Sequence, residues 1–153
     1  MMKVITSGIM MNTKHTVMNF DIGHIVTFSK TISEFDIYQF AGITGDFNPL
    51  HVNEEYAQAT RFGKRIAHGM LTSSFICTAL GTQMPGVGTI HINQNLSFKK
   101  PVYIGDTITV KLELLEKNAD KNIWIIKSDV YNQHDEIVVE GTSIVKPPKG
   151  DEV

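Results

Sequence analysis

The segment from Met70 to Leu80 is apolar over most of its circumference when it is placed on a helix. Its large side chains recur at spacings of three and four residues, which is typical of a helix and not of a strand. A helix that is apolar on nearly every side must be buried on nearly every side. We therefore expect the rest of the chain to wrap around this segment.

The pattern changes after the glycine- and proline-containing residues 81–88. From there apolar and polar residues alternate with a period of two, which predicts strands at residues 90–98, 108–114, 123–131 and 137–145. An earlier short strand is expected within Phe20–Lys30. One helical segment followed by four strands in meander order favours an α+β domain, with a curved antiparallel sheet laid around the central helix.

Length and composition fit one domain. The 153 residues are enough to bury a core, and we expect a single domain over residues 20–146 between flexible tails at 1–19 and 147–153. A net charge of −2 gives no reason to expect nucleic acid, and the longest apolar segment is too short to cross a membrane. The only cysteine, Cys77, cannot form an internal disulfide, so a reducing cytoplasm is the expected location.

Two shorter helices are expected before the central one. Thr31 and Glu34 fit a capping box, after which apolar residues recur at helical spacing until Gly42 and Gly45. Asn53 followed by two glutamates reads as the start of a second short helix that ends near Thr60. The stretch between these helices is where the chemistry is expected.

That stretch reads G-D-F-N-P-L-H from Gly45 to His51. On one unbroken helix the side chains of Asp46 and His51 would point about 140° apart. Pro49 interrupts the helix and turns the chain, so both groups can reach one side and act as an acid–base pair. Downstream, Gly69 opens the central helix with unpaired N–H groups that suit a developing negative charge.

Three motifs in this order resemble the R-specific enoyl-CoA hydratases of the MaoC-like dehydratase family, over about Phe20 to Val145. They are G-D-F-N-P-L-H, R-F-G-K-R-I-A-H-G-M-L and L-S-F-K-K-P-V-Y-I-G-D-T-I-T-V. The resemblance implies a hot-dog fold and a homodimer with a continuous sheet, with further assembly left open. It assigns Asp46 and His51 as the catalytic pair and the Gly69 N–H as the group that polarises the thioester. The activity implied is reversible syn addition of water to a trans-2-enoyl-CoA, giving the (R)-3-hydroxyacyl-CoA.

Further candidates surround this catalytic set. Asn48 is expected to fix the turn and, less often, to touch substrate. The substrate pocket is expected to include Phe47 and Leu50 as walls, Met70 in the first turn of the central helix, and Cys77 facing the carboxylate where some relatives have a hydroxyl residue. Basic residues that could pair with coenzyme A phosphates are Arg61, Lys64, Arg65, Lys99 and Lys100.

No cofactor is expected beyond the coenzyme A of the substrate, and no residues have metal-ligand spacing. His68 precedes the central helix and is expected to cap or pack, so it stays outside the predicted catalytic set. Hot-dog domains host several thioester chemistries, so a dehydratase acting on acyl carrier protein or a thioesterase is an alternative. A non-catalytic acyl-CoA-binding subunit of the same fold is the other.

Overall fold

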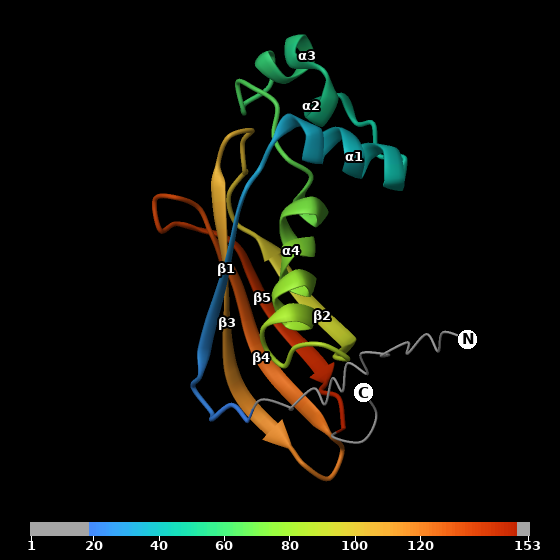
Figure 1. Cartoon of the computed structure of the whole chain (residues 1–153). Helices are drawn as coiled ribbons and strands as arrows, with labels where there is room; N and C mark the ends of the chain where they lie inside the picture. The colour runs from blue at the N-terminus through green and yellow to red at the C-terminus, as the bar shows by residue number, and fades with distance from the viewer. Residues whose placement is uncertain (1–18, 150–153) are drawn as a thin grey trace, which may run out of the picture.

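The computed structural model describes residues 19–149 of the chain. Its helices and strands run from Ile25 to Lys146, with three short helices before one long helix and four strands after it (Figure 1). In chain order these elements are β1 Ile25–Thr31, α1 Glu34–Thr44, α2 Pro49–Val52, α3 Glu54–Gln58, α4 Gly69–Thr82, β2 Ile90–Phe98, β3 Thr107–Asn118, β4 Ile123–Tyr131 and β5 Ile137–Lys146.

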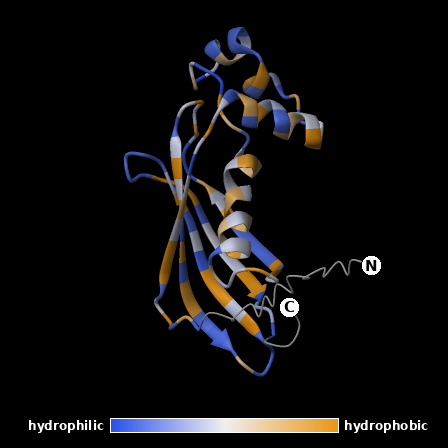
Figure 2. Ribbon diagram, in the orientation of Figure 1, coloured by the Kyte–Doolittle hydropathy of each residue, from blue (hydrophilic) through white to orange (hydrophobic). Residues whose placement is uncertain are grey.

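The five strands form one antiparallel sheet in the order β1-β3-β4-β5-β2, and α4 lies against it. Helices α1, α2 and α3 gather beyond the N-terminal end of α4 (Figure 1). The core lies between α4 and the sheet, where the rings of Phe75 on α4 and Phe28 on β1 stack at 6.2 Å. Figure 2 shows hydrophobic and hydrophilic residues interleaved along the strands, as a sheet with one covered face requires. The predicted hot-dog architecture is confirmed.

The predicted meander is correct only for β3, β4 and β5. Strand β2 pairs with β5 at the far edge, and the chain then crosses to β3, which lies beside β1. Alternation reveals which residues form a strand and which face is buried, but it carries no information about the partner strand. For that reason the predicted position of β2 in the sheet was wrong.

The expectation that α4 is buried on nearly every side was also wrong for the single chain. Met70 is 57% exposed, and Ser74 and Cys77 are exposed on the same stripe of the helix. A sheet of five strands covers α4 from one side only, so the opposite side stays open. Among the described residues, no helix is long and apolar enough to span a membrane.

The predicted N-terminal caps of α1 and α3 agree with the structure, except that the capping box of α1 begins two residues later than predicted. The capping box of α1 uses Ser33 and Asp36, because Thr31 is still part of β1 and its hydroxyl bonds to Thr107 at 2.7 Å. The predicted cap at Asn53 is confirmed, since its side chain accepts from Tyr56 N at 3.0 Å. The short helix α2 was not expected.

Candidate active site

The turn between α1 and α2 is built from two successive side-chain-to-backbone hydrogen bonds. Helix α1 ends at Gly45, whose φ of 79° is left-handed and suits glycine. Asp46 Oδ1 then accepts from Asn48 N at 3.2 Å, and Asn48 Oδ1 accepts from Leu50 N at 3.1 Å. These bonds reverse the chain direction and start α2, so His51 returns toward Asp46. Asn48 thus fixes the turn, as the sequence predicts.

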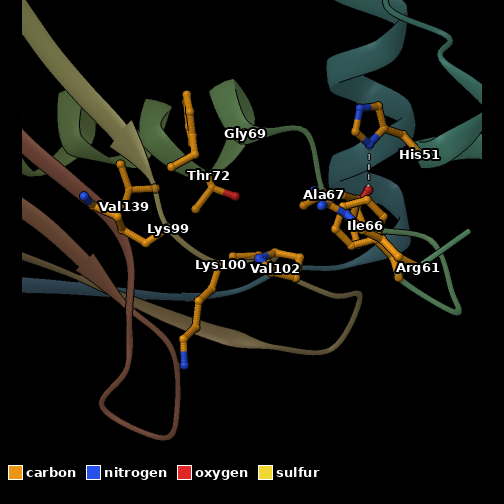
Figure 3. A pocket seen from close by; sticks show the side chains of 13 residues that line it. His51, Arg61, Ile66, Ala67, Gly69, Thr72, Lys99, Lys100, Val102 and Val139 are labelled. Carbon is orange, nitrogen blue, oxygen red and sulfur yellow. Dashed lines mark hydrogen bonds between the residues drawn. The ribbon is translucent and has the colours of Figure 1, made fainter.

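His51 has one defined tautomer. Its Nδ1 donates to the main-chain oxygen of Ile66 at 2.8 Å, and a carbonyl only accepts, so Nδ1 carries the hydrogen (Figure 3). Burial lowers the pKa of His51 below its ordinary value of 6.5, and the nearby His68 lowers it further, against the Ile66 carbonyl and Asp46. The imidazole is therefore neutral at neutral pH, and its Nε2 is left with a free lone pair.

Asp46, His51 and His68 offer polar atoms that lie within 4.8 Å of one another. A water molecule that bonds to two groups at about 2.8 Å each, at a tetrahedral angle, separates them by about 4.6 Å. The distance between the Asp46 carboxylate and the His51 ring is therefore short enough for one shared water. The sequence left this distance open.

Within this cluster the two histidine rings are in contact. The rings of His51 and His68 stack with centroids 3.9 Å apart and planes inclined by 32°. The nearness of the two histidines was missed from the sequence, because they lie 17 positions apart in the chain.

Gly69 is the first residue of α4. The hydrogen bonds of this helix begin with Thr72 N, which donates to His68 O at 3.1 Å, so the Gly69 N–H precedes the ladder. The N-cap residue His68 makes no side-chain cap bond to these groups. A side chain at this position would have little room, because a Cβ on Gly69 would lie 2.8 Å from Cε1 of Phe98. The glycine thus keeps the N-terminus of α4 accessible.

Two hollows meet at this point. The first, of about 280 Å³, is called the Lys99 hollow here and extends from His51 past Gly69 and Thr72 to the basic residues Lys99 and Lys100 (Figure 3). The second, of about 430 Å³, is called the Asp46 hollow and contains the polar cluster. Both are lined by His51, Gly69 and Phe98, so two of the predicted catalytic groups, His51 and Gly69, lie where the two join. The Asp46 hollow is otherwise lined by Phe40, Thr44, Asp46, His68 and Met70.

Of the other residues predicted to contact the substrate, some line the two hollows and some do not. Arg61 and Lys99 line the Lys99 hollow, and Met70 lines the Asp46 hollow. Phe47 is 59% exposed, and neither it nor Leu50 lines the two hollows.

Cys77 lies two turns further along α4, where its sulfur is 3.4 Å from Nδ1 of His91. The residue as a whole is exposed, but partial burial of its sulfur raises the pKa of the thiol, and Cys77 borders neither hollow. The important groups that sequence reasoning missed are Phe98 and the Ile66 carbonyl. Phe98 stands in the quoted L-S-F-K-K-P motif, so a signal existed for it, whereas a main-chain carbonyl leaves none.

Two other predicted cations are already engaged. Arg65 bridges Glu34 and Glu54 at 2.5 and 3.1 Å. Lys64 lies over the ring of Tyr103 at 4.4 Å. Lys99 and Lys100 pair with Glu140 and Glu136, but both pairs are about half exposed and are expected to exchange readily with a phosphate.

Known proteins are similar to this chain in sequence and in fold. The chain is 46% identical over 126 residues to an (R)-specific enoyl-CoA hydratase of Rhodospirillum rubrum, a match that covers 82% of this chain and 87% of the relative. It is 41% identical to a 3-hydroxybutyryl-CoA dehydratase of Methylorubrum extorquens, covering 86% and 83%. The solved (R)-hydratase from A. caviae, described as involved in PHA biosynthesis, superimposes with a TM-score of 0.82 at 36% identity, covering 84% and 98%. Residues 20–137 match the family described as MaoC like domain, and the chain belongs to that family.

Proposed function

We propose that this protein is an (R)-specific enoyl-CoA hydratase, a hydro-lyase that reversibly adds water to a trans-2-enoyl-CoA. The observation that carries the proposal is the approach of Asp46 and His51 to within 4.8 Å, beside the N-terminus of α4. The names of the two relatives at 46% and 41% identity support it, since both describe this chemistry in one direction or the other.

The acid–base pair meets the first need of the reaction, a water held and deprotonated at C3. Asp46 and the His51 Nε2 hold the water between them, and the pair removes its proton as the C3–O bond forms. The π electrons move toward the thioester oxygen as an enolate, which then collects a proton at C2. Because the water and the acid–base pair lie on the same side of the substrate, both additions occur on one face, and the product is the syn adduct.

The N-terminus of α4 meets the second need, stabilisation of the enolate. The Gly69 N–H precedes the hydrogen-bond ladder of a helix of 14 residues, whose dipole is positive at this end. A donor aimed at a developing oxyanion typically lowers the barrier by about 3–4 kcal/mol. The open Cα of Gly69 lets the thioester approach closely.

Coenzyme A is assigned to the Lys99 hollow. Arg61 and Lys99 line it together with Lys100, and basic side chains at the mouth of a pocket suit the phosphates of the coenzyme. The acyl group would then pass Gly69 into the Asp46 hollow, whose lining includes the apolar side chains of Phe40 and Met70. No cofactor is needed for this reaction beyond the substrate's own coenzyme A.

The protein is proposed to work as a homodimer. Strand β2 is an edge strand with Ile90 and Ile92 exposed, and it lies against α4, whose open stripe contains Met70 and Cys77. An unpaired edge strand and a helix stripe that both expose apolar side chains form the kind of surface that a second copy covers, by pairing β2 with β2. Analytical ultracentrifugation should give a dimer, and Ile92→Lys should dissociate it. The control Ile22→Lys adds the same charge at an exposed isoleucine near the other edge and should leave the dimer intact.

The decisive experiment for the activity uses crotonyl-CoA and the variant Asp46→Asn. The wild-type protein should deplete the enoyl thioester absorbance and yield (R)-3-hydroxybutyryl-CoA, and the variant should lose this activity while keeping its circular dichroism spectrum. Release of free thiol would instead identify a thioesterase. Turnover of the acyl carrier protein thioester alone would identify a dehydratase of that class, and binding without turnover would identify a non-catalytic subunit. Full activity in the folded variant would refute the role of Asp46.

A further inference from the structure

His68 touches all three parts of the proposed catalytic set. His68 is 2% exposed, and its ring packs against the ring of Phe40, with centroids 5.0 Å apart, and against the ring of His51, at 3.9 Å. Its main chain leads directly into Gly69 as the N-cap of α4. The residue is therefore packed on one side of the acid–base pair and joined to the oxyanion donor.

A hydrogen bond ties His68 to the third part. Its Nε2 lies 3.0 Å from the main-chain oxygen of Asp46, and that oxygen only accepts, so Nε2 carries the hydrogen. The other ring nitrogen, Nδ1, is buried and has no hydrogen-bond partner among the described residues. An unpaired buried acceptor is unfavourable for folding, so stability alone does not account for a histidine here.

We propose that His68 is a positioning residue for the hydration reaction: its Nε2–H fixes the main chain of Asp46, and its ring fixes the plane of the His51 ring. This inference rests on the proposed function. The Asp46 carboxylate extends from the residue whose carbonyl is held, and the His51 Nε2 can reach the shared water only in one ring plane. A displacement of about 1 Å in such groups can slow a reaction by on the order of 100-fold.

The charges around His51 define what a pH profile would report. Asp46 and His68 face it directly, and Arg61, Lys99 and Lys100 line the Lys99 hollow that it borders. Helix α1 contributes the uncharged side chains of Phe40 and Thr44. His68 lowers the pKa of His51, so removing the second imidazole should raise the pH at which His51 takes up a proton.

Two variants separate the hydrogen bond from the ring contact. His68→Gln keeps an N–H donor at a similar reach but removes the ring, whereas His68→Phe keeps a ring but removes the donor. We expect His68→Phe to lower kcat by on the order of 10- to 100-fold with KM nearly unchanged, because the Asp46 main chain is released. His68→Gln should keep kcat within several-fold of the wild type and should move the acid limb of the kcat/KM profile to higher pH.

A readout that does not depend on turnover accompanies the kinetics. The ring resonance of His51 is followed by NMR against pH, and in both variants it should titrate at a higher pH than in the wild type. The matched control His134→Gln replaces an exposed histidine in the turn between β4 and β5 and should leave both the kinetics and the His51 titration unchanged.

The possible results separate this inference from the proposed function. A wild-type protein that hydrates neither crotonyl-CoA nor longer trans-2-enoyl-CoAs refutes the function, while the NMR titration still tests the contact between the two rings. An active wild type with unchanged kinetics in both variants overturns the positioning role. Equal losses in two folded variants overturn the role of the hydrogen bond, and failure of both variants to fold assigns His68 to structure alone.

Discussion

Replacing Gly69 by alanine should separate the stability of the fold from the chemistry of the site. The added Cβ would lie 2.8, 3.0 and 3.2 Å from Cε1, Cδ1 and Cζ of Phe98. These are atoms at the far end of a side chain that is 52% exposed, so the ring can rotate outward. Alanine also favours a helix over glycine by up to about 1 kcal/mol, and less at the first position. The free energy of unfolding should therefore change by about 1 kcal/mol or less.

The activity should respond far more strongly. The new methyl group and the displaced Phe98 ring would occupy the space through which a thioester oxygen reaches the Gly69 N–H. Loss of one oxyanion donor typically costs about 2.7–4 kcal/mol of transition-state stabilisation, which corresponds to a decrease in kcat of roughly 100- to 1,000-fold. Initial rates of crotonyl-CoA hydration measure this decrease, and urea denaturation of the same preparation measures the stability.

A second substitution distinguishes a blocked donor from a simple clash. In Gly69→Ala with Phe98→Ala, the ring that meets the new Cβ is gone, but the methyl group still lies beside the N–H. If access to the donor is what matters, the double variant stays as slow as Gly69→Ala. Recovery of the rate would mean that only the displaced ring was harmful. Retention of kcat within about threefold in Gly69→Ala itself would refute the assignment of the oxyanion donor.

Three further outcomes test other parts of the structure. The pKa of His51 is lowered in the folded protein, so between that pKa and 6.5 the unfolded state binds more protons than the folded state. The free energy of unfolding should therefore fall as the pH drops below 6.5. The melting temperature of His51→Gln should depend less on pH over this range than that of the wild type. Arg61→Ala should raise KM for crotonyl-CoA several-fold with little change in kcat, whereas Lys121→Ala, in the distant turn between β3 and β4, should change neither in the same steady-state assay. Gly141→Ala should lower the urea midpoint by an amount equivalent to about 1–3 kcal/mol, because its Cβ would lie 2.6 Å from the main-chain oxygen of Ser128, which cannot rotate away as Phe98 can.

The features that could be predicted from the sequence are those encoded within a few neighbouring residues. The period of α4, the start of that helix at Gly69 and the cap at Asn53 all depend on local spacing, and each lies where it was expected. The edge position of β2 depends on a crossover between distant strands, and alternation is the same whichever strand is the neighbour.

In the candidate site, too, local features could be predicted from the sequence and contacts between distant residues could not. The turn that carries Asp46 toward His51 follows from Asn48 and Pro49, which act over two or three residues. The orientation of the His51 ring follows from the Ile66 carbonyl, 15 positions away, and a carbonyl is common to every residue type. Residue identity therefore indicates which groups are candidates for the reaction, while their alignment depends on contacts that only the folded chain displays.

Those distant contacts come from one segment of three residues. Ile66 orients His51 through its carbonyl, His68 holds the carbonyl of Asp46, and the next residue is Gly69. The segment is itself fixed at Ala67, whose N–H donates to Val102 O at 2.7 Å. The proposed acid–base pair and the proposed oxyanion donor thus share a single support, so a shift of this segment is expected to affect all three groups. We therefore expect their mutual geometry to depend on the contact between Ala67 and Val102, which holds this segment against the chain before β3.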